Sequence, residues 1–325
     1  MKKILFFLSF ALFVVSSCSQ KTDNELAPTQ PSHEEAITSL IADIDNLNYE
    51  FKINQTKGGL RNAILTAAAD RAGGMLGSWI GGHIGAGLGV VTANPVVGVV
   101  GYVGGRKIGS VAGFAAASYL ADIVLNNNQS DYNSDPNCSF YLSLYDALYN
   151  QVSMEVDIPN DSNYSVGEVH NMILAKLTTN GKTYRNEDGS FNTDELYNDA
   201  VQLETQIGID STISSNDTYK NTFLSFYQDV ITAAQRKVDL RRSDEQYKED
   251  LIQATINRGL PADEVREITC ITDMLIASAD LEHEDKIAYG QEFAVIVENS
   301  SLPEREKSAV IEAGSVTIFS IEYWD

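Results

Sequence analysis

Histidine imidazole can act as a general base and as a metal ligand near neutral pH, so the histidines are the first residues to consider for chemistry. The chain has four, His33, His83, His170 and His283, and none belongs to a His-x-x-x-His zinc pair. The sequence also has no Gly-x-Ser-x-Gly elbow and no phosphate-binding loop beside a strand. His170 could be a base or a ligand, but we favour a structural histidine that bonds to backbone near a helix start. We therefore predict no enzyme activity, no cofactor and no metal site.

Two cysteines beyond residue 130, Cys138 and Cys270, lack the spacing of zinc ligands. In an oxidising compartment they could form one disulfide that ties the first helix of this region to a late one. Two buried thiols are an equally good interpretation. The sequence leaves both open.

The loop from Thr178 to Asp194 is the part of this region richest in Asn, Asp and Gly. Five residues occupy positions 3, 5, 6, 9 and 12 of an EF-hand-like calcium loop: Asn186, Asp188, Gly189, Asn192 and Glu195. Tyr184 stands where the first aspartate belongs, so we favour an ordinary turn over a calcium site. The loop also carries Arg185, and exposed polar loops are where proteases cut.

Glycine recurs at every fourth position on both sides of the segment 92–95, and this repeat is the most unusual feature of the chain. The glycines are Gly73, Gly77, Gly81, Gly85, Gly89, Gly101, Gly105, Gly109 and Gly113. Each internal glycine costs a helix about 0.5–1 kcal/mol relative to alanine, so the repeat must provide another gain. Small residues four apart allow helices to approach closely in lipid. We therefore predict two glycine-faced helices joined by a tight turn and suited to a membrane.

The residues around this repeat both support and limit a membrane role. From Ala72 to Gly105 there is no Asp, Glu, Lys or Arg, and about 34 helical residues would cross the roughly 30 Å hydrocarbon layer once and start back. Arg106 and Lys107 then interrupt the second arm, at about 2.5–3.5 kcal/mol each if they were central in a bilayer. Conditional insertion, or an oligomer with a wet lumen, tolerates them better than a permanent anchor. The alternative is a hairpin buried in the protein's own core.

The N-terminus is typical of an export signal, with Lys2-Lys3 before an apolar core. Val15-Ser16-Ser17-Cys18 resembles the lipobox of bacterial lipoproteins. By that resemblance residues 1–17 are a signal peptide, Cys18 is the acylated (palmitate-bearing) first residue of the mature chain, and Ser19 favours the outer membrane. Residues 18–57 would then form a tether. A secreted protein that has lost Cys18 is the alternative.

The charge distribution separates the glycine-rich region from the rest. The formal net charge is −22, yet residues 58–125 carry four Lys/Arg against two Asp. The acidity therefore lies elsewhere, chiefly after residue 125. This excludes nucleic acid as a partner, because no basic patch is present to neutralise phosphates. It suits solubility outside the cell and could shield a membrane-active hairpin.

Residues 137–325 have helical periodicity and no alternating run that would predict a sheet. Phe140, Leu144, Leu148 and Val152 repeat every four residues, and Ser165 is a candidate cap for the next helix. The fold class predicted is all-α, with a glycine-zipper helical hairpin (58–125) followed by an acidic multi-helix domain (137–325).

Two short sequences carry a family resemblance: residues 164–171 (Tyr-Ser-Val-Gly-Glu-Val-His-Asn) and 320–324 (Ser-Ile-Glu-Tyr-Trp). Together with the lipobox and the glycine repeat, they resemble lipoprotein bacteriocins of Gram-negative, Bacteroidales-type bacteria. The resemblance implies a toxin that kills related bacteria and is activated by a clostripain-like protease that cuts after arginine. A rival resemblance is to the small glycine-zipper lipoproteins of the envelope, which residues 80–87 suit equally.

From these observations we expect an antibacterial outer-membrane lipoprotein that permeabilises target membranes through its hairpin, after cleavage at Arg185. Its expected partners are the target-cell membrane, an Arg-specific protease, a surface receptor and an immunity protein. The alternative is a non-toxic outer-membrane lipoprotein whose hairpin is a structural anchor.

Overall fold

The computed structural model describes residues 31–51, 61–88, 111–126, 132–153, 165–209 and 211–324. The predicted signal peptide, Cys18 and the connection between the two arms of the hairpin lie outside these residues, together with Gly89, Gly101, Gly105 and Gly109. Within them the chain is helical, and the one β-type pairing is an isolated bridge between Arg185 and Phe191. The predicted all-α class is confirmed.

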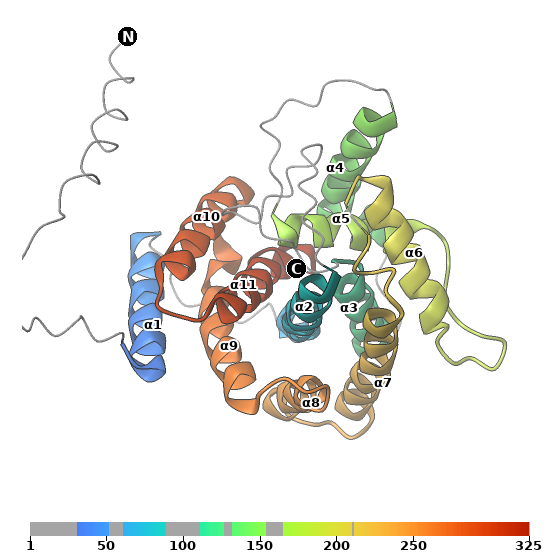
Figure 1. Ribbon diagram of the computed structural model, residues 1–325. Helices are drawn as coiled ribbons and strands as arrows, with labels where there is room; N and C mark the ends of the chain where they lie inside the picture. Colours follow the sequence, from blue (N-terminus) through green and yellow to red (C-terminus); the bar gives the residue numbers. More distant parts are fainter. Residues whose placement is uncertain are drawn as a thin grey trace, which may run out of the picture.

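The helices follow one another along the chain in the order shown in Figure 1. They are α1 (His33–Glu50), α2 (Arg61–Leu88), α3 (Val111–Leu125), η1 (Tyr132–Ser134), α4 (Pro136–Ser153), α5 (Val166–Thr179), α6 (Thr193–Gln206), α7 (Asp217–Asp239), α8 (Asp244–Ile256), α9 (Ala262–Leu275), η2 (Ile276–Asp280), α10 (His283–Asn299) and α11 (Glu304–Trp324).

Helix α2 lies in the middle of the molecule. In Figure 1 the surrounding helices are α11, α9, α8, α7 and α3, and each of them contacts α2. Its side chains from Leu65 to Ser78 are all buried, and so is α3 from Val111 to Ile123. A helix that is apolar on every side is covered in a water-soluble fold only if other helices enclose it. Amphipathic helices such as α7 and α9 do so with one buried face each.

Helices α2 and α3 lie side by side and run in opposite directions. Asn62, near the start of α2, donates to Asn126, just after α3, and Gly73 lies against Phe114 at the other end of α3. A Cβ atom on Gly73 would lie 2.5 Å from the Phe114 Cβ atom, so only glycine permits this approach. The arms of the predicted hairpin therefore exist as an antiparallel pair.

Four described glycines of this pair, Gly73, Gly74, Gly77 and Gly113, pack against other residues and not against each other. A Cβ on Gly113 would lie 2.7 Å from the Phe223 ring of α7, and one on Gly77 would lie 3.0 Å from the Tyr219 hydroxyl. The predicted glycine-to-glycine zipper is thus not what joins the described parts of the arms. Among the described helices, none has both the length and the hydropathy needed to cross a membrane.

The division into a hairpin and a separate acidic domain differs from the structure. Helices α2 and α3 share one continuous hydrophobic core with α5, α7 and α11. The reason is the surface of the arms: with no polar face of their own, they can be covered in water only by the helices that follow them.

The predicted tether (18–57) is also wrong over part of its length, because α1 occupies His33–Glu50. Ser32 and Glu35 form a capping box at its start, and apolar residues four apart fix its buried face. That face consists of Ala36, Leu40, Ile44 and Leu47. Because this segment is mostly polar, its short amphipathic pattern was not recognised as a helix.

Helix α4 forms where the sequence predicted a helix, but it buries the adjacent stripe of residues. Cys138, Tyr141 and Tyr145 face the core together with Leu148 of the predicted stripe, whereas Phe140 of that stripe is 39% exposed. The two stripes have the same spacing, so the periodicity alone could not choose between them. The predicted cap of α5 is confirmed, since Ser165 and Glu168 form a capping box.

Candidate functional site: polar contacts at the start of the buried arm

Asp70 is a fully buried carboxylate on the apolar helix α2. Ser320 Oγ on α11 donates a short hydrogen bond to Asp70 Oδ2, and Trp324 Nε1 lies 3.3 Å from the same oxygen. His170 Nε2 on α5 lies 3.4 Å from the other oxygen, Oδ1. Because Ser320 and Trp324 are four residues apart, they lie on the same face of α11. Three segments distant in sequence therefore meet at one carboxylate.

The two sequences that carry the family resemblance are in contact here. Asn171 Nδ2 donates to the Phe319 carbonyl oxygen at 2.9 Å, and the Gly167 amide donates to Ser315 Oγ at 3.0 Å. A Cβ on Gly167 would lie 2.3 Å from the Ser315 carbonyl oxygen, so glycine is required for α5 to cross α11 this closely. The first residue of the resemblance, Tyr164, lies outside the described residues.

His170, Asp70 and Ser320 are the residue types of a hydrolase triad, but the geometry is different. In a triad the histidine bonds to the serine it activates, whereas here Ser320 and His170 both approach the carboxylate of Asp70. All three side chains are buried. His170 also stacks on Phe114 at 5.6 Å and bonds to Asn171 through Nδ1 at 3.0 Å. The arrangement can hold helices together and gives a substrate no access to the serine.

Arg71, the next residue of α2, binds a different neighbour. Its Nη1 atom lies 2.5 Å from Asp273 Oδ1 and 3.3 Å from Thr272 Oγ1, both on α9. Lys248 Nζ lies 3.5 Å from the same carboxylate oxygen. We call the contacts of Asp70 with Ser320, Trp324 and His170, and of Arg71 with Thr272 and Asp273, the clamp.

A second buried carboxylate, Asp122, lies near the end of α3. It accepts hydrogen bonds from Asn126 Nδ2 at 2.5 Å and from the Tyr132 hydroxyl. Burial raises the pKa of Asp122 to about 7; the Asn126 bond opposes this rise, and the negative charge of Asp70 adds to it. Both arms of the hairpin therefore carry a buried carboxylate near the same end.

A half-buried ionic group lies beside the α5–α11 crossing. His283 Nδ1 lies 3.0 Å from Glu322 Oε1, His283 Nε2 lies 3.6 Å from Glu168 Oε1, and Lys286 Nζ lies 3.2 Å from Glu322 Oε2. Burial lowers the pKa of His283, but the hydrogen bonds with Glu168 and Glu322 outweigh it and raise that pKa to about 9. Burial likewise opposes the shift of Glu322, whose pKa is nevertheless held below its usual value by His283 and Lys286.

Of the two interpretations left open for the cysteines, the disulfide is not formed, because Cys138 and Cys270 are both free thiols. Cys138 is buried on α4, where its sulfur lies 3.6 Å from the Tyr323 hydroxyl. Cys270 is exposed on α9, so the alternative of two buried thiols holds for Cys138 only. Burial raises the pKa of the Cys138 thiol, which disfavours the reactive thiolate.

The residues at calcium-loop positions serve the turn and the next helix. Asp188 accepts from the amide and hydroxyl of Ser190, and Asn192 caps α6. Glu195 pairs with Lys182. Within the described residues, no group of three acidic, histidine or cysteine side chains is placed to hold a metal ion.

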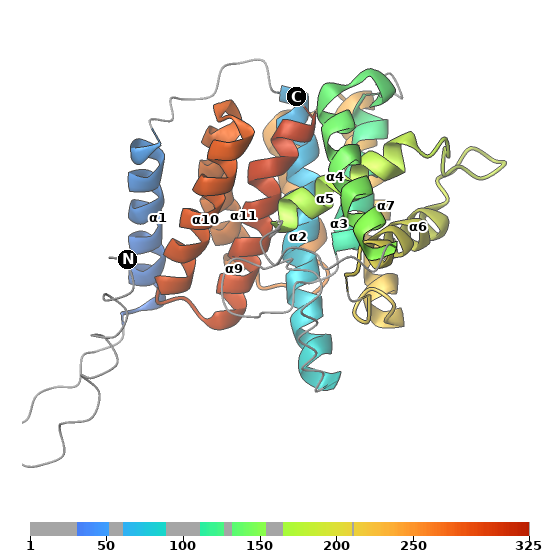
Figure 2. The same ribbon diagram turned by 90° about the horizontal axis from the view of Figure 1, so that it is seen from above.

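Arg185 lies in the exposed loop between α5 and α6, which projects from the body of the protein in Figure 2. Its guanidinium stacks on the Phe191 ring at 4.1 Å, and Nη1 donates to the Gly189 carbonyl oxygen at 2.9 Å. The preceding residue, Tyr184, is buried and has a positive φ of 46°. The loop is therefore accessible but folded on itself.

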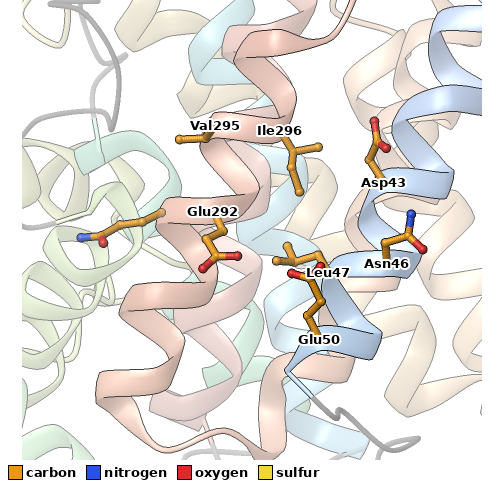
Figure 3. Close-up of a pocket in the computed structure, with 8 residues that line it drawn as sticks. Asp43, Asn46, Leu47, Glu50, Glu292, Val295 and Ile296 are labelled. Carbon is orange, nitrogen blue, oxygen red and sulfur yellow. The ribbon is translucent and has the colours of Figure 1, made fainter. Parts of the chain in front are cut away.

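A groove of about 490 Å³ lies between α1 and α10. Figure 3 shows Leu47 and Ile296 between the carboxylates Asp43, Glu50 and Glu292. Three carboxylates, two amides and three apolar side chains line the groove.

The sequence alone did not predict the clamp, because Asp70 and Arg71 were counted only as charges of the glycine-rich region. One signal was available: these opposite charges lie in a helix immediately before the uncharged run. A comparison with known proteins adds no further constraint, because the chain matches no protein family, no curated protein and no solved structure.

Proposed function

We propose that this protein is an antibacterial, outer-membrane lipoprotein toxin that permeabilises the membranes of related bacteria through the α2–α3 hairpin. The observation that supports this most directly is the enclosure of two glycine-bearing, apolar arms by amphipathic helices of the same chain. Such arms need cover in water and none in lipid. The fold is therefore suited to storing a membrane-active element in a soluble form.

The position of the far end of α2 agrees with this proposal. In Figure 2 the last turns of α2 extend beyond the neighbouring helices on one side of the bundle. The connection between the arms follows this end.

Enclosure also discriminates against the alternative of a permanent structural anchor. An anchor places its apolar surface in lipid, so it does not need covering helices. Here Phe223 of α7 and Ala313 of α11 pack directly on Gly113 and Gly74 of the arms. The cover and the packed glycines are also what a hairpin buried permanently in the protein's own core would have, and the proposal adds a conditional second location to this one.

Activation by cleavage after Arg185 is part of the proposal. A cut there would divide the chain between α5 and α6, which leaves α2 and α11 on different fragments. The contacts between α2 and α11 are the most extensive in the molecule, so the fragments would remain associated in water. Cleavage would thus make separation possible at a membrane without forcing it in solution.

The test uses purified protein, before and after treatment with an Arg-specific protease, on dye-loaded liposomes and on related strains. We expect leakage and growth inhibition, both lost in the variant Gly81→Leu/Gly85→Leu while helical circular dichroism persists, because two isobutyl groups block close helix approach. Arg185→Ala should remain uncut and inactive. Absence of leakage and of killing by the cut wild type would reject the toxin in favour of the anchor.

A further inference from the structure

The residues of the clamp indicate a more specific role than general stabilisation of the fold. We propose that the Asp70–Arg71 clamp is the barrier that retains α2 inside the bundle, and that its opening must precede release of the hairpin. This inference rests on the proposed function for its purpose. The part of the inference that concerns the fold, selective retention of α2 in the bundle, can be measured without a membrane.

The clamp lies on α2 at the start of the uncharged run. Asp70 and Arg71 lie at the boundary of the uncharged run, and the next ten residues are Ala, Gly, Met, Leu, Ser, Trp and Ile only. Within residues 64–81 of α2, Asp and Arg side chains therefore occur only at two adjacent positions, and one further cation, Arg305 of α11, lies over the Trp79 ring at 3.6 Å. From these positions Asp70 reaches α5 and α11, and Arg71 reaches α9. One turn of α2 is thus bound to three surrounding helices.

The contacts of α2 differ in whether lipid can replace them when α2 moves from the bundle into a membrane. Apolar contacts such as that of Gly74 with Ala313 can be replaced by contacts with lipid tails, which are about as apolar as leucine. The hydrogen bonds of a buried carboxylate and guanidinium have no such replacement in hydrocarbon. Transfer therefore loses the clamp contacts and regains most of the others. The clamp contributes more to the barrier than its share of the interface would indicate.

The clamp residues of α2 are also enclosed by the surrounding helices. Asp70 is fully buried and Arg71 is 4% exposed, so water does not already compete at these two side chains, whereas Asp273, the partner of Arg71, is 40% exposed. Removal of one partner from such a pair leaves a buried charge without compensation, which opens the local structure. Variants of the clamp should therefore loosen α2 selectively.

The experiment compares clamp variants with matched controls. Ser320→Ala removes the hydroxyl that donates to Asp70, and Ser315→Ala removes an equally buried α11 hydroxyl that bonds to Gly167 of α5. Arg71→Met breaks the pair with Asp273, and Arg258→Met breaks a similar pair, also with a buried arginine and a partly exposed carboxylate, between the turn after α8 and Asp229 of α7. If Arg71→Met does not fold, the two serine variants decide the question.

The first measurement is amide hydrogen exchange in full-length Cys18→Ser protein without lipid. We expect exchange in residues 72–81 to accelerate about tenfold or more in the clamp variants, as expected from loss of a hydrogen bond to a charged group. Residues of α10 should stay within about twofold of the parent protein. The control variants should leave α2 unchanged by the same criterion. Equal acceleration of α2 and α10 in the clamp variants would overturn the inference.

The second measurement is dye leakage from liposomes, which separates the inference from the proposed function. Faster leakage by the uncut clamp variants than by their controls supports both. Selective loosening of α2 without any leakage, even after protease treatment, would retain the clamp and reject the toxin. Leakage by the cut wild type together with unchanged α2 exchange in the clamp variants would retain the toxin and reject the clamp.

Discussion

Helix α1 buries one face and leaves the other in water, whereas α2, the next helix in the chain, is buried on nearly every side that the structure describes. The outer face of α1 carries five carboxylates and no Lys or Arg. The first helix is thus adapted to one environment, at the edge of a soluble fold (Figure 1). Helix α2 has an apolar surface that is not adapted to water, and it depends on the neighbouring helices to cover that surface. Four predictions test this contrast.

The largest expected effect is on location and concerns Cys18, the predicted site of a lipid anchor before α1. Cys18→Ser should move the protein completely from the membrane fraction to the soluble fraction of producing cells, because acylation would be the only attachment. Fractionation and blotting measure this. If the variant stays in the membrane fraction, α2 is already inserted in the producer and its difference from α1 has another cause.

The next effect is on stability at the buried face of α1. Leu40→Ala should lower the free energy of unfolding by about 2–5 kcal/mol, because it leaves a cavity in the core. The exposed neighbour Ser39→Ala should stay within about 0.5 kcal/mol of wild type. Urea denaturation followed by circular dichroism provides both values. Equal, small changes would show that α1 is not part of the cooperative core.

Two adjacent glycines on α2 provide a sharper comparison within one helix. Gly73→Ala should destabilise the protein by about 1–3 kcal/mol, since the new Cβ would meet Phe114 Cβ at 2.5 Å. Gly74→Ala meets Ala313 Cα at 3.4 Å, an ordinary contact, and should gain up to about 1 kcal/mol from helix propensity. Thermal unfolding distinguishes the two. The same sign for both variants would contradict the close approach of α2 and α3.

The smallest effect is the pH dependence from His283, which lies outside both helices. Its pKa in the folded protein is about 9, above the 6.5 of the unfolded chain, so the folded state binds the proton more tightly. The stabilisation is fully present below pH 6.5 and is lost as pH rises through about 9. We expect a loss of about 1–2 kcal/mol, after allowance for partial exposure to solvent. Unfolding measured from pH 6 to 10 should show this slope, and His283→Gln should remove most of it.

The parts of the fold that local sequence determines could be predicted. The absence of alternating runs indicated helices throughout, and Ser165 with Glu168 has the spacing of a capping box. Helix α1 was detectable in principle, because Leu40, Ile44 and Leu47 have helical spacing. The choice of the Tyr141 stripe over the Phe140 stripe on α4 was not, because it depends on which neighbour α4 meets.

The candidate site could not be predicted, because its contacts are distant in sequence. Ser320 is 250 residues from Asp70, and Asp273 is 202 residues from Arg71. No local pattern specifies such a pairing, and a single sequence gives no covariation to reveal it. Only the two short sequences that carry the family resemblance indicated where to look, and they supply His170 and Ser320.

The contact between α2 and α11 has a consequence for biosynthesis. A ribosome makes α2 long before α11, so more than two hundred residues must be added before α2 acquires the helix that covers it most extensively. Until then the nascent or translocating chain presents an uncovered apolar helix, and a chain that ended before residue 304 would present it permanently. Synthesis of α11 is therefore needed to cover α2 in each copy, and a product that lacked α11 would be prone to aggregation or to degradation by the cell that made it.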